Sequence, residues 1–340
     1  MSDNMMKFLE KRDDHFDFCK SMIVLGMINA HIFLSFYIHF FSLTYRIINL
    51  SAFVFLSGLT STVLSNYGRT SLLRTITRAG KLIGIFAISN LILLLLSRTR
   101  YEHLFSESGL QTLLSLFLGT KQAFVALDVL VPIAFTMLVS IFFVHRLIWY
   151  LTIAYACACL LILYAIESYS LINFYTIKLI FIGQIGSALG NWFIRLDWGD
   201  IAYKYFRPLP LLGLFIIISC YFLFVPLHYR NDVPFSYALL PTVLSLFFLY
   251  LFSSVFRLSS FPIVRLLNRT LAKNMLFAYI FHIIINQLLL FILKQYRYPL
   301  FPTIILSLLL IFITISACFL VNYLTEKYPI FKLLYGLIFK

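Results

Sequence analysis

The sequence has little charge: Asp, Glu, Lys and Arg make up 12% of its 340 residues, and only 13 of them are acidic. A soluble globular domain carries about 25% charged residues, so this chain has too few to cover a water-facing surface. Hydrophobic residues make up 61%, including 37 Phe and 21 Tyr. Such aromatic residues suit lipid-facing surfaces and the interfaces of a bilayer. The composition excludes an ordinary soluble domain and predicts a membrane protein.

The sequence also lacks the cysteine pattern of a metal site or a disulfide framework. Its five cysteines have neither spacing, and four of them sit in apolar runs: they are Cys19, Cys157, Cys159, Cys220 and Cys318. We therefore expect free thiols that pack as small hydrophobic side chains, and no metal. The first apolar run is long and no small-residue cleavage site follows it, which predicts a retained first helix and not a signal peptide.

The chain has no internal repeat, no low-complexity tract and no alternating strand pattern, and its apolar runs are continuous. A membrane-spanning helix needs roughly 20 mostly apolar residues. Ten runs qualify, near residues 18–41, 47–67, 81–97, 123–144, 147–166, 176–194, 209–227, 236–256, 274–293 and 299–324. Residues 105–122 are amphipathic and suit a helix in the outer interface. The prediction is one all-α polytopic domain over residues 1–340.

The net charge of +14 comes from 27 Lys and Arg residues. Basic and aromatic residues do not interleave as they do in a nucleic-acid groove, so we expect no nucleic-acid partner. Most of the basic residues fall in the connections on the same side as the N-terminus, where they would face anionic lipid. This asymmetry and the even number of spans predict that both ends of the chain are cytoplasmic.

The first span carries ionisable residues, although a charged group costs on the order of 3 kcal/mol or more at the centre of a spanning helix. Lys20 and His31 are eleven residues apart, within about 20° of three whole helical turns, so they share one face. Asp17 shares this face near the membrane edge. The pattern suits a cation at the cytoplasmic mouth and an imidazole near mid-membrane. The alternative is that Lys20 reaches the interface and His31 only bonds a neighbouring helix.

A second polar stripe lies in the span near 274–293, where Tyr279, His282 and Asn286 recur at i, i+3 and i+7. Three polar groups on one stripe of an apolar helix predict a polar cavity. Asp128, with Pro132 one turn later, marks a polar site near the outer end of the fourth span. Asp128 could be a positioning or acid–base group, or it could simply lie near water.

Two further patterns each allow a structural and a functional interpretation. Ser57 and Gly58 end the stretch FVFLSG, and Gly186 and Gly190 form a small-xxx-small pair; both predict close helix packing. Arg74, Arg78 and Lys81 recur on one face of the stretch 69–81 that leads into the third span. This face suits either lipid headgroups or the phosphates of a ligand.

Taken together, these motifs resemble the acyltransferase 3 superfamily of integral membrane acyltransferases, and within it most closely the OpgC-type periplasmic glucan succinyltransferases. The motifs are, in order, Asp17-Phe-Cys-Lys20 with His31 eleven residues later, FVFLSG, Arg78-Ala-Gly-Lys81, Asp128-Val-Leu, the Gly- and Gln-rich sixth span, and Tyr279-Ile-Phe-His282. They cover most of residues 13–290. Two positions differ, since Lys20 and Lys81 stand where the family has arginine, and lysine keeps the charge but lacks the bidentate fork.

The resemblance implies an enzyme of the bacterial inner membrane that holds no permanent cofactor. Acyl-CoA, with an acetyl or succinyl group, would be the cytoplasmic donor, its phosphates bound by Lys20, Arg74, Arg78 and Lys81. The acceptor would be a hydroxyl of a cell-envelope or periplasmic glycan. His31 would be the general base, with His282 and Asp128 in further catalytic roles.

The remaining motif residues, Asp17, Ser57, Tyr279 and Asn286, would help to bind the substrates. A transporter or flippase for a glycolipid or small solute, and a catalytically inactive relative, are the alternative functions.

Overall fold

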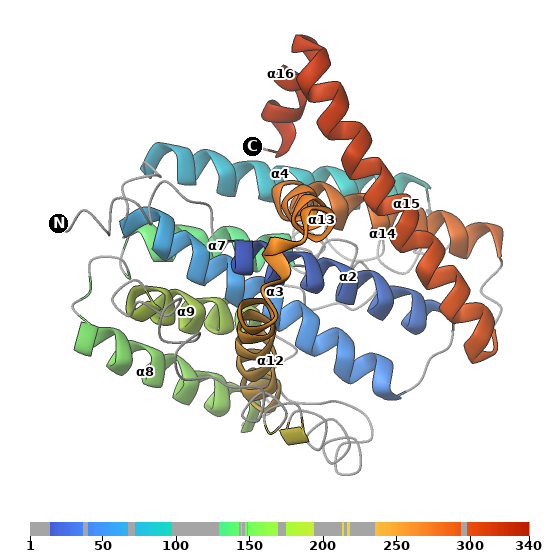
Figure 1. Ribbon diagram of the computed structural model, residues 1–340. Helices are drawn as coiled ribbons and strands as arrows, with labels where there is room; N and C mark the ends of the chain where they lie inside the picture. Colours follow the sequence, from blue (N-terminus) through green and yellow to red (C-terminus); the bar gives the residue numbers. More distant parts are fainter. Residues whose placement is uncertain are drawn as a thin grey trace. The chain divides into compact units, whose positions relative to one another are not determined.

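The computed structural model describes residues 14–36, 40–66, 72–96, 129–142, 144, 147, 149–168, 175–193, 213, 216–217, 235–293 and 298–339 (Figure 1). These residues form helices and contain no strand, which confirms the all-α prediction. The helices are α2 (Asp14–Phe36), α3 (Phe40–Asn66), α4 (Leu72–Leu96), α7 (Leu130–Phe142), α8 (Trp149–Ser168), α9 (Tyr175–Phe193), α12 (Phe235–Val255), α13 (Pro262–Lys273), α14 (Met275–Ile292), α15 (Leu300–Lys327) and α16 (Pro329–Phe339), with a 3-10 turn η4 at Leu258–Ser260.

Nine of the ten predicted spans overlap one of these helices, and the number of spans stays a prediction. The exception is 209–227, of which the structure describes only Gly213, Ile216 and Ile217, and residues 105–122 lie outside the described residues. By length and apolar character, four described helices can cross a bilayer: α2, α8, α12 and α15. The bent pair α13–α14 makes a fifth if it is counted as one span. The protein is therefore an α-helical multi-pass membrane protein.

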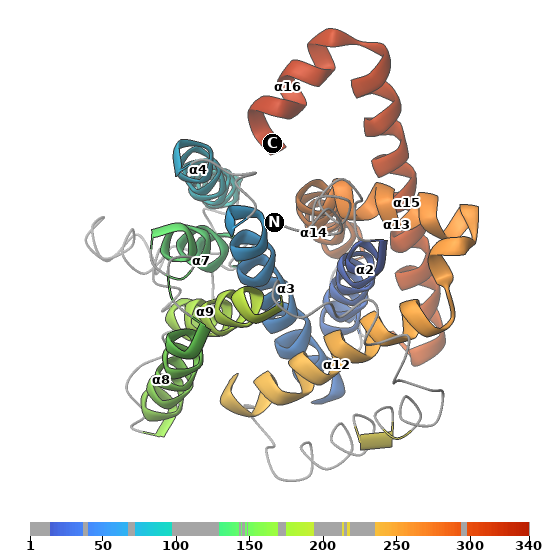
Figure 2. The same cartoon turned by 60° about the vertical axis from the view of Figure 1, so that its left-hand side comes forward.

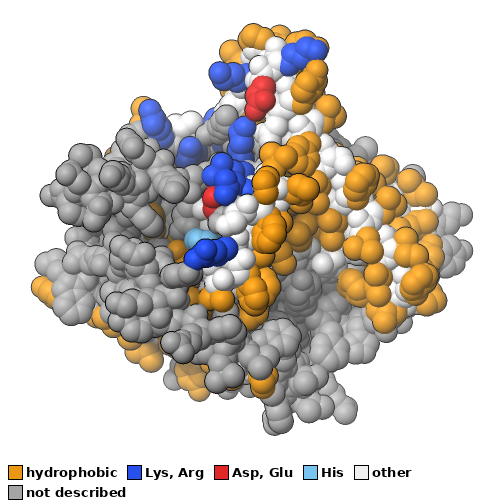
Figure 3. Space-filling model, viewed as in Figure 1, with side chains coloured by type: hydrophobic (Ala, Val, Ile, Leu, Met, Phe, Trp, Pro, Cys, Tyr) orange, Lys and Arg blue, Asp and Glu red, His pale blue; other side chains and the backbone are white. Residues whose placement is uncertain are grey.

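The surfaces of α8 and α15 are apolar and exposed. Only 17% of the spanning window of α8 and 22% of that of α15 is buried inside the protein. Figure 3 shows orange hydrophobic side chains along α15 on the face in view. Apolar surface of this extent is unfavourable in water. Contact with lipid chains avoids that cost.

The described helices belong to two compact units, and each is described here by itself. Unit 1 contains α2, the start of α3, most of α12, and α13 to α16; unit 2 contains the rest of α3 with α4, α7, α8 and α9. The boundary falls inside α3, between Ala52 and Phe53.

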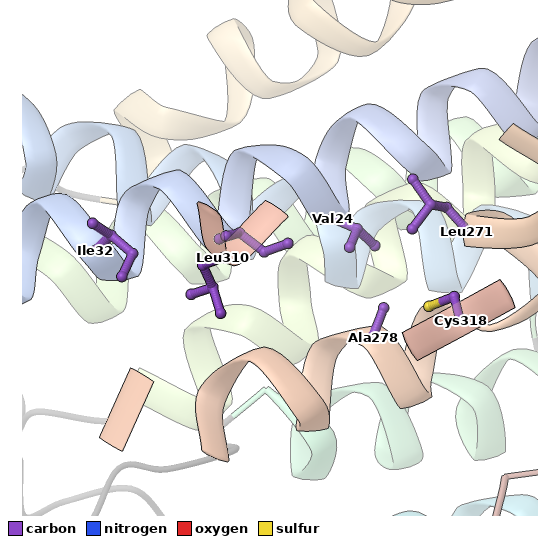
Figure 4. Packing of buried hydrophobic residues seen from close by; sticks show 7 residues of the cluster. Val24, Ile32, Leu271, Ala278, Leu310 and Cys318 are labelled. Atoms are coloured by element: carbon purple, nitrogen blue, oxygen red, sulfur yellow. The ribbon is translucent and has the colours of Figure 1, made fainter. Parts of the chain in front are cut away.

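In unit 1, α2 is packed against α13, α14 and α15. Its residues Val24, Ile28 and Ile32 recur every fourth position and so form one buried stripe. Ala278 of α14, Leu271 of α13, and Leu310 and Cys318 of α15 close over this stripe (Figure 4). The stripe holds α2 in a fixed rotation and so decides which way its polar residues face.

In unit 2, glycines bring helices into backbone contact. A Cβ atom on Gly58 of α3 would lie 2.0 Å from the Gly183 carbonyl oxygen of α9. One on Gly186 would lie 2.2 Å from the Phe55 carbonyl oxygen, and one on Gly190 would lie 2.7 Å from that of Leu59. No side chain larger than hydrogen fits at these points, which confirms the predicted close packing of FVFLSG and Gly186-xxx-Gly190.

Two helices were not expected from the sequence, α13 and α16. α13 meets α14 at an 80° bend (Figure 2). Asn274 is fully buried at this bend. Its Nδ2 donates to the carbonyl oxygen of Thr270 and to Oδ1 of Asn322, and its Oδ1 accepts from the Tyr335 hydroxyl at 2.7 Å. Asn274 therefore ties together α13, α15 and α16.

The cysteines follow the sequence prediction where they are described. Cys19, Cys157, Cys159 and Cys318 are free thiols, and all but Cys157 are buried. Cys220 lies outside the described residues.

Candidate functional site

Two histidines predicted from separate motifs meet inside unit 1. Nδ1 of His31 on α2 lies 2.8 Å from Nε2 of His282 on α14. The two rings lie edge to edge and nearly in one plane, with centroids 5.1 Å apart and an angle of 22° between their planes. His282 is completely buried and His31 is half-buried. The residues are 251 positions apart in the chain, and the stripe of α2 that packs on α14 brings them together.

The hydrogen bonds fix the tautomers of both rings. Nδ1 of His282 lies 2.9 Å from the Ala278 carbonyl oxygen, one turn earlier on α14. A carbonyl can only accept, so this Nδ1 carries the hydrogen. In a neutral ring, Nε2 of His282 is then an acceptor and takes the hydrogen from Nδ1 of His31. The lone pair of a neutral His31 is therefore on Nε2, which is the atom that can act as a base.

The rest of the predicted stripe on α14 is also buried. Tyr279 is 1% and Asn286 is 5% exposed. The Tyr279 ring meets the edge of His282 at a centroid distance of 5.6 Å. The stripe of polar residues on α14 therefore faces the protein interior, and Tyr279 lies beside the histidine pair. The polar cavity stays a prediction.

The first turns of α2 lie beside α13. Asp17 is buried and Lys20 is half-buried. Ser21 follows Lys20 and donates its hydroxyl hydrogen to the Asn268 carbonyl oxygen of α13 at 3.0 Å. Lys20 therefore lies next to the point where α2 contacts α13.

The predicted basic face in unit 2 is part of a continuous helix. α4 begins at Leu72 and runs to Leu96, so Arg74, Arg78 and Lys81 lie on the same helix as the third span. Arg74 and Arg78 are exposed, and Lys81 is half-buried. Their role in donor binding stays a prediction.

Ser57 is half-buried on α3, beside Gly58. Gly58 is in backbone contact with α9, so this stretch has a packing role whatever else Ser57 does. Asp128 lies outside the described residues. Among the residues that the structure describes, no group of three or more His, Cys, Asp or Glu could hold a metal ion.

Sequence analysis did not identify two polar contacts of unit 1. Ser307 of α15 donates to Oδ1 of Asn29 on α2. Arg265 and Arg269 of α13 contact Asp14 of α2, and Arg269 does so through two hydrogen bonds of 2.8 and 3.2 Å. The spacing of the α13 cations at every fourth residue was the sequence feature that could have revealed this helix.

No protein-family model matches the chain, and neither does any curated protein or solved structure. The family resemblance therefore rests on the motifs alone. The geometry of the histidine pair is the basis for assigning a function.

Proposed function

We propose that the protein is a membrane O-acyltransferase that moves an acetyl or succinyl group from cytoplasmic acyl-CoA to a hydroxyl of an envelope or periplasmic glycan. The supporting observation is the His31–His282 pair, in which one ring orients the other and leaves Nε2 of His31 as a base. Ionisable groups inside a membrane domain are costly and usually mark a functional site. Two such groups in contact in the packed core of unit 1 are difficult to explain by packing alone.

The proposed topology has ten spans, with both ends in the cytoplasm of a bacterium and the domain in its inner membrane. The helices found at nearly all predicted spans support this number. The excess of basic residues on the N-terminal side supports the orientation. Asp14 then begins α2 at the cytoplasmic end, and His31 lies about 26 Å further along the helix, at a rise of 1.5 Å per residue.

The reaction starts when Nε2 of His31 removes the proton from the acceptor hydroxyl. The resulting oxygen nucleophile attacks the thioester carbonyl carbon, and a tetrahedral intermediate forms. When this collapses, the carbon–sulfur bond breaks, the new ester bond remains, and the CoA thiolate takes the proton from His31. The products are the acylated glycan and CoA, and His31 returns to its starting state.

His282 acts through His31. As His31 gains a proton on Nε2, its Nδ1–H bond to His282 becomes charge-assisted and stronger. Because the Ala278 carbonyl holds the other side of the His282 ring, the base is already oriented before the substrate arrives. Tyr279 and Asn286 are proposed to position the acceptor and to donate to the oxyanion of the intermediate.

In this proposal the cations bind the donor. Lys20 lies at the cytoplasmic end of α2, and Arg74, Arg78 and Lys81 form one face of α4; all four would bind the phosphates of acyl-CoA. Asp17 and Ser57 are assigned to substrate binding, and Asp128 to a further acid–base or positioning role, on the motif resemblance alone.

The experiment that tests this function is thiol release. Purified protein in lipid nanodiscs is given acetyl-CoA or succinyl-CoA, with and without an envelope-glycan extract, and free CoA is followed. We expect release with one donor that depends on the glycan extract. Folded protein that releases no CoA from either donor would contradict the proposal and favour a transporter or an inactive relative.

A further inference from the structure

α13 is an amphipathic helix with a row of cations on one side. Arg265, Arg269 and Lys273 recur at every fourth residue, and the helix contains no acidic residue. Leu271, two residues from both Arg269 and Lys273, points nearly the opposite way and is buried in the core of unit 1. The packing of Leu271 therefore holds the row of cations outward.

The position of α13 is also fixed at its end. The 80° bend at Asn274 turns α13 away from the direction of α14. His282 lies seven residues beyond Met275, so the histidine pair is about two turns along α14 from this bend. The row of cations thus lies at the end of the bundle where α2 begins, within the same unit as the histidines.

The carboxylate of Asp14 on α2 contacts two of these three cations. Nε and one terminal nitrogen of Arg269 donate to the two oxygens of Asp14, at 2.8 and 3.2 Å, and Nε of Arg265 lies 3.7 Å from Asp14 Oδ2. Figure 3 shows blue Lys and Arg side chains around a red acidic side chain in the region where Figure 1 draws α13 and the start of α2. The charge of Asp17 also acts on the Arg269 guanidinium.

This geometry is that of an oxyanion site. Two parallel hydrogen bonds from one guanidinium are the arrangement by which arginine binds both carboxylates and phosphates. The arginine side chains are 43% and 45% exposed, so a ligand can reach them. Three cations against the carboxylates of Asp14 and Asp17 still leave the row with positive charge to attract a further anion.

We propose that Arg265, Arg269 and Lys273 form a phosphate-binding site at the end of unit 1, which Asp14 occupies when no ligand is bound. The ligand is a phosphate ester, either the nucleotide end of acyl-CoA or the headgroup phosphate of a lipid. The choice of acyl-CoA as the ligand rests on the proposed function. The existence of the phosphate-binding site does not depend on that function. A bound phosphate displaces the Asp14 carboxylate from Arg269 and takes over its two hydrogen bonds.

The test measures binding to the full-length protein in maltoside detergent, which carries no phosphate. The two probes are adenosine 3′,5′-bisphosphate and phosphatidylglycerol in mixed micelles. Arg269→Gln and Arg265→Gln should each weaken binding of one probe by about 10-fold, because a charge-assisted hydrogen bond is lost. Asp14→Asn should strengthen the same binding, because the competing carboxylate is gone. Lys332→Gln removes an exposed cation of α16 and serves as the matched control, with no expected change.

The probe that responds identifies the source of the phosphate. If Arg269→Gln and Asp14→Asn weaken binding together, the pair only fastens α2 to α13, and the proposal is wrong. It is also wrong if neither probe distinguishes the variants from wild type. Because binding needs no turnover, adenosine bisphosphate binding with the expected variant pattern but no CoA release would contradict the proposed function and leave this site intact.

Discussion

Within each of the two units, neighbouring helices are held together by a different kind of contact. In unit 2, α3 and α9 meet through Gly58, Gly186 and Gly190, and carbonyl oxygens fill the space where side chains would be. In unit 1, α2 meets α14 and α15 through its apolar stripe and through two polar pairs, His31 with His282 and Asn29 with Ser307. Both arrangements hold helices together where the hydrophobic effect between helices is weak.

The difference shows what each unit can do. Glycine contacts give close approach without placing a reactive group in the membrane. An imidazole that acts as a base needs one nitrogen held by a hydrogen bond and a helix held in one rotation. Unit 1 provides both for His31, through the bond from its Nδ1 to His282 and the apolar stripe of α2. We therefore assign the chemistry to unit 1 and a rigid packing role to the α3–α9 contact.

The largest effect should come from filling a glycine contact in unit 2. Gly186→Leu places a side chain against the Phe55 carbonyl and should destabilise the protein by about 3 kcal/mol or more, enough to reduce the yield of folded protein. Gly84→Leu is the matched control, because a Cβ there meets nothing within 4 Å. Unfolding temperature and size-exclusion profile in detergent are the measurements. Equal behaviour of the two variants would show that the glycine contacts do not hold unit 2.

The next effect concerns the orientation of His31. His282→Ala removes the acceptor for its Nδ1–H and should lower kcat for thiol release on the order of 100-fold, as a misplaced catalytic group does. His282→Gln keeps an acceptor near the same place and should recover much of kcat. KM for the donor should change little in either variant. A loss that glutamine does not relieve, or one that falls mainly on KM, would argue against an orienting role.

A smaller effect should follow from the polar contact between α2 and α15. Ser307→Ala removes the hydrogen bond to Asn29 and should lower the free energy of unfolding by about 1 kcal/mol. Thr303→Val on the same helix is the control, since the hydroxyl of Thr303 bonds only to the Pro299 carbonyl one turn away. Denaturant titration in detergent compares the two. If Thr303→Val costs as much as Ser307→Ala, the interhelical bond carries no special stability.

The smallest effect should be at α16. Tyr335→Phe removes the hydrogen bond to Asn274 and should weaken the docking of this helix by about 1 kcal/mol. Faster proteolysis within 329–339 and an unchanged unfolding temperature are expected. Tyr328→Phe is the control, because the ring contact of Tyr328 with Phe331 survives the change. Global destabilisation by Tyr335→Phe would instead make α16 part of the core.

Helix positions could be predicted from the sequence because a bilayer sets both the length and the composition of a span. α8 was expected at 147–166 and lies at Trp149–Ser168, and α14 was expected at 274–293 and lies at Met275–Ile292. α13 could not be found in this way, since its basic residues made it look like a cytoplasmic connection. Only the spacing of those residues at every fourth position indicates a helix.

The candidate site could be predicted one helix at a time. Helical periodicity showed that Lys20 shares a face with His31, and that Tyr279, His282 and Asn286 share another. It could not show that the two faces meet, because the rotation of α2 depends on packing by residues as distant as Leu310 and Cys318. The pairing of His31 with His282, and with it the choice of Nε2 as the base, required the structure.

The most direct test of the central claim compares the rate of glycan-dependent CoA release by wild type, His31→Ala and His15→Ala, all purified in nanodiscs. His15 is the other histidine of α2 that the structure describes, and its Nδ1 lies 3.1 Å from the Ser253 hydroxyl. We predict that His31→Ala lowers the rate by about 100- to 10,000-fold, as expected for loss of a general base, and that His15→Ala stays close to wild type. Unchanged release by folded His31→Ala protein would contradict the account.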